Sequence, residues 1–81
     1  MVTFIMLSYD SNAIDAGVDV TLERYGKGLI KTSPDYPIMT IDEPLADSQE
    51  ILKDIMAIFQ NKQVHTLICD GDGNLLNSTL Q

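Results

Sequence analysis

Residues 44–61 read PLADSQEILKDIMAIFQN, and they hold the clearest periodic pattern in the 81-residue chain. Apolar side chains recur there every three or four positions, which predicts one amphipathic helix over 44–61. The apolar positions are Leu45, Ile51, Leu52, Ile55, Met56, Ile58 and Phe59. Pro44 is typical of a first helical position. A later start is the alternative, because Asp47 and Glu50 also have the spacing of a capping box.

The apolar stripe of this predicted helix covers more than half of the helix circumference. A helix that only rests on a sheet needs a narrower stripe than this. We therefore expect one side of the helix to face a sheet, and the remainder, including Met56 and Ile58, to face a partner subunit.

The strand patterns lie on both sides of this helix. Residues 2–9 are apolar at nearly every position, which is typical of a central strand. Residues 18–25 alternate between apolar and polar side chains, which indicates a half-buried strand. The full set of predicted strands is 2–9, 18–25, 29–33, 64–69 and 75–79.

The segment between the second and third predicted strands resembles a tight turn. Side chains alternate between the two faces of a hairpin, and only a three-residue loop at 26–28 keeps the apolar ones on the same face. Gly28 would then have the left-handed conformation. This register places Glu23 opposite Lys31. It also pairs Tyr25 with Leu29 on the outer side of the hairpin, which makes that pair a candidate contact patch.

The remaining segments read as connections. Residues 10–17 are rich in turn-forming side chains and predict a loop, and residues 33–37 contain two prolines and predict a rigid extended link. Residues 38–41 are either a short edge strand or a segment packed on the core. We therefore expect one α+β domain over 1–81. Its small antiparallel sheet would have four to five strands, in the order β, β-hairpin, α, β-hairpin, packed on one amphipathic helix.

Charge excludes several classes of partner. Twelve acidic and five basic residues give a net charge of −7, and the basic residues are scattered. Nucleic acids and anionic membranes need a concentrated positive patch, so we expect neither as a direct partner. A larger protein with a basic surface is physically suited to this charge. The apolar run at 1–7 is too short for a signal peptide or a membrane span, so we expect a cytoplasmic protein.

No set of side chains points to catalysis. His65 and Cys69 are the only residues of their kinds. On one strand they would share a face but stand roughly 13 Å apart, too far for the cysteine to be activated. We expect a half-buried Cys69, a surface His65, no catalytic residue and no cofactor.

The segment from Asp70 to Asn74 has one feature of a metal site. Asp70, Asp72 and Asn74 have the spacing of the first three ligands of a calcium loop. The sixth position should be glycine but is Leu75, and the twelfth should be glutamate but is Gln81. We therefore predict a plain hairpin turn and no dedicated metal site, with weak cation binding as the alternative.

These observations favour a small acidic protein-binding module, an inhibitor or regulator that acts on a larger protein. Small acidic proteins encoded by phages or mobile elements supply the analogy. The predicted partner-binding residues are Glu23, Tyr25, Leu29, Met56 and Ile58. In a stricter version, Asp10, Asp15, Asp19 and Glu23 line one face and imitate a track of phosphates. The alternative function is a homo-oligomeric, for example homodimeric, structural or small-ligand-holding domain without catalysis.

Overall fold

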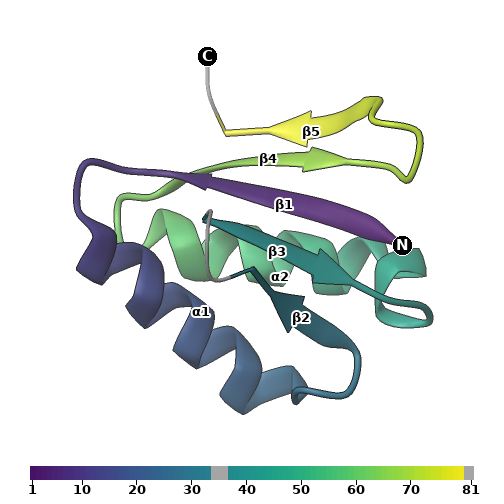
Figure 1. Ribbon diagram of the computed structural model, residues 1–81, viewed down its shortest axis with the longest axis horizontal. Coiled ribbons are helices and arrows are strands. Elements are labelled where there is room, and N and C mark those ends of the chain that lie inside the picture. Colours follow the sequence, from purple (N-terminus) through teal and green to yellow (C-terminus); the bar gives the residue numbers. More distant parts are fainter. Residues whose placement is uncertain (34–36, 80–81) are drawn as a thin grey trace.

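The computed structural model describes residues 1–33 and 37–79 and contains five strands and two α-helices in the order β1-α1-β2-β3-α2-β4-β5 (Figure 1). A 3₁₀ turn at Leu45–Asp47 precedes the second helix. The strands are β1 (Val2–Leu7), β2 (Ile30–Thr32), β3 (Ile38–Ile41), β4 (His65–Cys69) and β5 (Leu75–Ser78). The helices are α1 (Ser11–Tyr25) and α2 (Gln49–Gln60).

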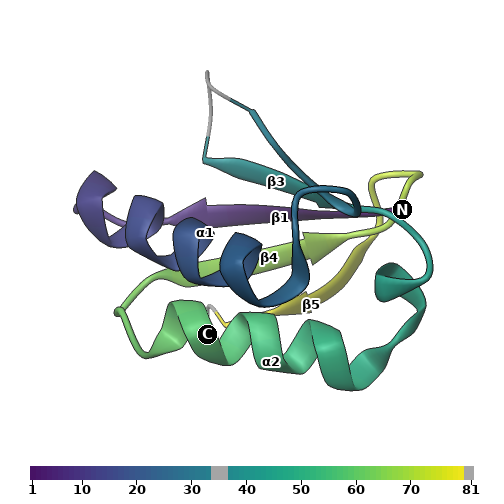
Figure 2. The ribbon, with the colours of Figure 1, turned by 90° about the horizontal axis from the view of Figure 1, so that it is seen from below.

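The strands form one antiparallel sheet in the order β2-β3-β1-β4-β5. The prediction that the first strand is central is therefore confirmed, since β1 lies between β3 and β4. Both helices lie on the same side of the sheet (Figure 2). The helices α1 and α2 connect β1 to β2 and β3 to β4, and β5 extends the sheet at one edge. The α+β class and the antiparallel sheet agree with the sequence-based prediction.

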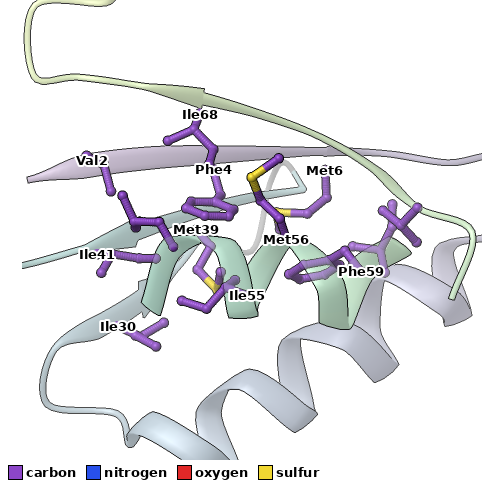
Figure 3. Close-up of a cluster of buried hydrophobic side chains, with 13 residues drawn as sticks. Val2, Phe4, Met6, Ile30, Met39, Ile41, Ile55, Met56, Phe59 and Ile68 are labelled. Carbon is purple, nitrogen blue, oxygen red and sulfur yellow. The ribbon is translucent and has the colours of Figure 1, made fainter. Parts of the chain in front are cut away.

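Alternation along the strands places the core between the sheet and the helices. In β1, Val2, Phe4 and Met6 are buried, whereas the residues between them are more exposed. Phe4 and its cross-strand neighbour Met39 are fully buried and meet Ile55 of α2 in one cluster (Figure 3). The core is thus made of aliphatic, methionine and phenylalanine side chains, and β1, β2, β3 and β4 each turn one of their two faces toward it.

The largest departure from the sequence-based prediction is α1. Residues 18–25 were expected as a strand and 10–17 as a loop, but together they form one helix from Ser11 to Tyr25. Its inward positions are Ala13, Ile14, Gly17, Val18, Thr21, Leu22 and Tyr25. That spacing is helical, and two of its members, Val18 and Leu22, together with Val20 between them, produce the apparent strand alternation over 18–23.

Both ends of α1 have ordinary capping residues. The carboxylate of Asp10 accepts hydrogen bonds from the amides of Asn12 (3.0 Å) and Ala13 (3.4 Å). At the other end Gly26 has φ 89° and its amide donates to the carbonyl of Leu22 at 2.8 Å. Positive φ therefore belongs to Gly26 and not to Gly28, and 26–28 connects a helix to a strand.

The predicted hairpin register is consequently wrong. Glu23 and Tyr25 lie on the last turn of α1, so neither has a cross-strand partner. Lys31 pairs with Thr40 of β3 instead, and its ammonium lies 3.4 Å from a carboxylate oxygen of Asp42. Residues 38–41 are a strand, as one alternative held, but an internal one, because β3 lies between β2 and β1.

Helix α2 begins later than Pro44. Ser48 has an extended backbone and caps the helix, with its hydroxyl accepting from the amide of Ile51 at 3.3 Å. This agrees with the alternative expectation that the helix starts after Pro44, but the capping residue is Ser48 and not Asp47. The predicted strands at 64–69 and 75–79 and the turn between them are confirmed as β4 and β5.

The wide apolar surface of α2 is explained within the chain. Met56 and Ile58 are only 9% and 6% exposed. Met56 belongs to the core cluster, and α1 packs beside α2 on the same face of the sheet (Figure 2). Gly17 lets the two helices approach closely: a Cβ at this position would lie 2.6 Å from Cδ1 of Phe59, and closer still to Cε1. The expectation that Met56 and Ile58 face a partner subunit is therefore wrong, since both side chains are buried within the chain.

Candidate functional site

The structure does not bring the predicted partner-binding residues together on one surface. Met56 and Ile58 are buried. Glu23 is exposed and Tyr25 half-buried at the end of α1, while Leu29 lies half-buried just before β2. The proposed Tyr25–Leu29 pair depended on the hairpin that α1 replaces.

Tyr25 belongs to a small cluster that joins the two helices. Its hydroxyl donates a hydrogen bond to Asp54 of α2, and Arg24 donates to the same carboxylate at 2.8 and 3.0 Å. The hydrogen bond from Tyr25, and then that from Arg24, lower the pKa of Asp54. Burial, followed by the hydrogen bond to Asp54, raises the pKa of Tyr25. The carboxylate is fully engaged, so the cluster fixes α1 against α2 and offers no free group for chemistry.

Replacing Asp54 should therefore make stability depend less on pH. We expect Asp54→Asn to lower the Tm by a few degrees near pH 7. The pKa of Asp54 is lower in the folded state than in the unfolded state. The stability that its carboxylate adds to the wild type is therefore complete above the unfolded-state pKa of about 3.9, and it is lost as pH falls through the folded-state pKa. Thermal melts from about pH 7 to pH 2 should thus converge for the two proteins. Asp19→Asn, at an exposed position of α1, is the control and should show no such convergence.

His65 and Cys69 stand at opposite ends of β4 and on the same face of the sheet. Cys69 is half-buried and His65 is exposed, as predicted. The Nδ1 atom of His65 lies 3.4 Å from the hydroxyl of Thr79. Four residues of strand separate the imidazole from the thiol, so the two groups do not form a nucleophile–base pair within the chain.

The loop from Asp70 to Asn74 is the predicted turn. One carboxylate oxygen of Asp70 accepts from the amides of Asp72 and Asn74, both at 2.9 Å, and the other accepts from the Asn74 side chain at 3.3 Å. These hydrogen bonds, led by the Asn74 amide, lower the pKa of Asp70. Within 1–33 and 37–79, no three His, Cys, Asp or Glu side chains are placed to hold a metal ion.

A hollow of about 550 Å³ lies between α1 and the ends of β1, β2 and β3. Met6, Ile14 and Val18 give it an apolar wall, and Asp15 is its only ionisable residue. Half of its lining residues are exposed, and it ends at Ser33 and Pro37, which border residues outside the described part of the chain. Its volume is in the range of ligand pockets.

The acidic residues of α1 form a stripe on its exposed side. Asp15, Asp19 and Glu23 are all exposed and follow one another at intervals of four residues, about 6 Å along the helix. We call these three residues the acidic stripe. Asp10, expected on the same face, instead caps α1 with its carboxylate.

The other exposed surface is the side of the sheet that faces away from the helices, which we call the outer face. Cross-strand pairing aligns its side chains in rows, so that Ile38, Ile5 and Leu67 are neighbours on three strands. A second row runs from Thr40 through Thr3 to Cys69. The complete set is Thr3, Ile5, Leu7, Lys31, Ile38, Thr40, His65, Leu67, Cys69, Leu75 and Ser78.

The outer face differs in charge from the rest of the molecule. Every aspartate and glutamate in the described residues lies outside the five strands, so the centre of the outer face has no carboxylate. At its edge, Lys31 of β2 lies 3.4 Å from the carboxylate of Asp42. An apolar surface with few charges, on a protein of charge −7, is suited to binding a partner.

The fold and these surfaces define a small α+β domain with one face of its sheet uncovered by helices. Comparison with protein-family models, with curated proteins and with solved structures found no match. No helix among the described residues is long and apolar enough to cross a membrane. Function must therefore be argued from the two surfaces.

Proposed function

We propose that this protein is a non-catalytic, cytoplasmic protein-binding module, which inhibits or regulates a larger protein that has a basic surface. The observation that carries the proposal is the segregation of charge. The carboxylates lie on the helices and connections, while the centre of the outer face has none. Such a distribution gives the molecule one side that attracts basic partners and another that does not.

The acidic stripe supports this assignment because it has a cost in stability. Like charges four residues apart on a helix destabilise it by about 0.2–0.5 kcal/mol per pair. Asp15, Asp19 and Glu23 make no ion pair among the described residues that would offset this repulsion. Arg24, the one cation on α1, is bound to Asp54. A basic partner would remove the repulsion, and steering by the uncompensated charge would speed the encounter.

A test needs two variants with the same net charge. In the stripe variant, Asp15→Asn, Asp19→Asn and Glu23→Gln remove three charges from α1. In the control variant, Glu43→Gln, Asp47→Asn and Glu50→Gln remove three charges at exposed positions before and at the start of α2. Both change the net charge from −7 to −4, because each substitution removes one negative charge.

Immobilised wild-type protein captures partners from a lysate of the native host, and mass spectrometry identifies them. Each partner is then purified and titrated against the wild type, the stripe variant and the control variant. We expect the stripe variant to bind at least about tenfold more weakly, as for the loss of several interfacial charges, and the control variant to bind much like wild type. Wild-type affinity should fall as salt rises from about 50 to 500 mM. Equal binding by the stripe variant, with no dependence on salt, contradicts the proposal.

A further inference from the structure

We propose that the outer face of the sheet binds a second copy of this chain, giving a face-to-face homodimer in which the helices of both copies point outward. This inference goes beyond the proposed function and uses the opposite side of the molecule. The dimer would carry one acidic stripe on each of its two opposite sides.

The composition of the outer face fits this occupant. Apolar side chains lie at its centre, where Ile5 of β1 is flanked by Ile38 and Leu67. Small polar side chains lie next to them, with Thr3 between Thr40 and Cys69. A surface that meets its own copy across a two-fold axis must be complementary to itself, and an uncharged mixture of aliphatic and hydroxyl groups satisfies that requirement.

The size of the face is also sufficient. The molecule measures 29 × 28 × 25 Å, so one broad face is about a sixth of its accessible surface of 5104 Å², or roughly 850 Å². A standard protein–protein interface buries about 800 Å² on each partner. Face-to-face packing of two sheets, about 10 Å apart, is a regular arrangement in proteins.

Electrostatics select this face over the helix side for self-association. Contact between two helix sides would bring the acidic stripes of two copies together, and like charges in an interface cost affinity. With the outer faces in contact, the helix layers lie about 30 Å apart, counting about 10 Å between successive layers. That separation is nearly four times the Debye length of about 8 Å at physiological salt, so the repulsion between the copies is largely screened.

The same charge argument disfavours a basic protein as the occupant of the outer face. The centre of this face has no carboxylate to pair with lysine or arginine side chains, and burying those groups unpaired is costly. Basic partners are drawn to the helix side instead. Of the occupants that the net charge allows, a second copy is therefore the one that matches this face.

Two adjacent leucines on β5 provide a matched pair of test variants. Leu75 is 61% exposed and pairs with Cys69, which places it on the outer face. Leu76 is 53% exposed and lines a shallow hollow with Leu52 and Met56 of α2, which places it on the helix side. Leu75→Lys and Leu76→Lys therefore add the same charge at similar exposure on opposite faces. Leu67→Lys adds a charge near the centre of the outer face.

Sedimentation equilibrium from about 1 to 500 µM distinguishes the possibilities, a range that spans weak dimers. We expect the average mass of wild type and Leu76→Lys to rise above 9.0 kDa, while Leu67→Lys and Leu75→Lys stay at that value. The stripe variant should dimerise like wild type, which keeps this test independent of the proposed function. If thermal melting shows that Leu67→Lys does not fold, the average mass of Leu75→Lys is the deciding measurement. A wild-type monomer throughout, or a dimer that only Leu76→Lys disrupts, overturns the proposal.

Cys69 supplies a second measurement without any substitution. It is the only cysteine and lies on the outer face between Thr3 and Leu75. Its thiol should react at least about threefold more slowly with a maleimide reagent in the concentrated, dimeric protein than in the dilute monomer. In Leu67→Lys, the rate constant should not depend on protein concentration. A concentration-independent rate in wild type would contradict a dimer through this face.

Discussion

Gly17→Val should unfold a large fraction of this protein at moderate temperature. Gly17 faces the ring of Phe59, and a Cβ would lie 2.6 Å from Cδ1 and 3.2 Å from Cζ. Phe59 is fully buried and cannot swing into solvent. Either the ring or the whole of α1 must therefore move, and overpacking of this kind costs about 2–4 kcal/mol.

This cost is large relative to the total stability. A chain of this length has a free energy of unfolding of about 4–12 kcal/mol. We expect the Tm of Gly17→Val to fall by roughly 10–25 °C, measured by circular dichroism. Gly71→Val is the control, because nothing lies within 4 Å of a Cβ at that turn position. It should change the free energy of unfolding by less than about 1 kcal/mol.

A double-mutant cycle assigns the effect to the contact between the helices. Phe59→Leu removes the ring atoms that a side chain at position 17 would meet. It should destabilise the protein by itself, but in its presence Gly17→Val should cost at least about 1 kcal/mol less than in wild type. Strictly additive effects would mean that the loss arises from the helix backbone and not from the packing of α1 on α2.

Gly17 also shows why sequence patterns predicted one helix and not two. Glycine is a poor helix former, so its place after Asp15 and Ala16 favoured a loop. The reason for a glycine here is a tertiary contact with Phe59, some forty residues later in the chain, which no local pattern reveals. The sequence does contain one local signal for this helix, namely its two capping residues, Asp10 before it and Gly26 after it.

Helix α2 and the strands were predictable because their patterns are local. Twelve residues of α2 carry a strong apolar stripe, and β1, β4 and β5 have bounds close to those expected. The outer face was not predictable in the same way. Alternation assigns Ile5, Ile38 and Leu67 to one side of their strands, but the strand order makes them neighbours, and the position of α1 determines which side is covered.

The two faces of β1 should respond very differently to truncation. Phe4 is fully buried between the sheet and α2, so Phe4→Ala should cost about 3–5 kcal/mol and bring the protein close to unfolding. Its neighbour Ile5 points to the outer face and is only half-buried. In dilute solution Ile5→Ala should cost no more than about 1 kcal/mol. Urea titrations of both variants measure the difference, and similar losses would contradict the placement of the helices.

The cost of Ile5→Ala should also depend on protein concentration, whereas that of Phe4→Ala should not. A dimer that forms only from folded chains adds stability as concentration rises, and a substitution in its interface loses that addition. Repeating the titrations at about 2 and 200 µM tests this, because the range spans a dissociation constant in the micromolar region. If the outer face binds a second copy, the midpoint of wild type rises with concentration and that of Ile5→Ala rises less. If both midpoints stay fixed, Ile5 faces only water, and the outer face has no second copy as its occupant.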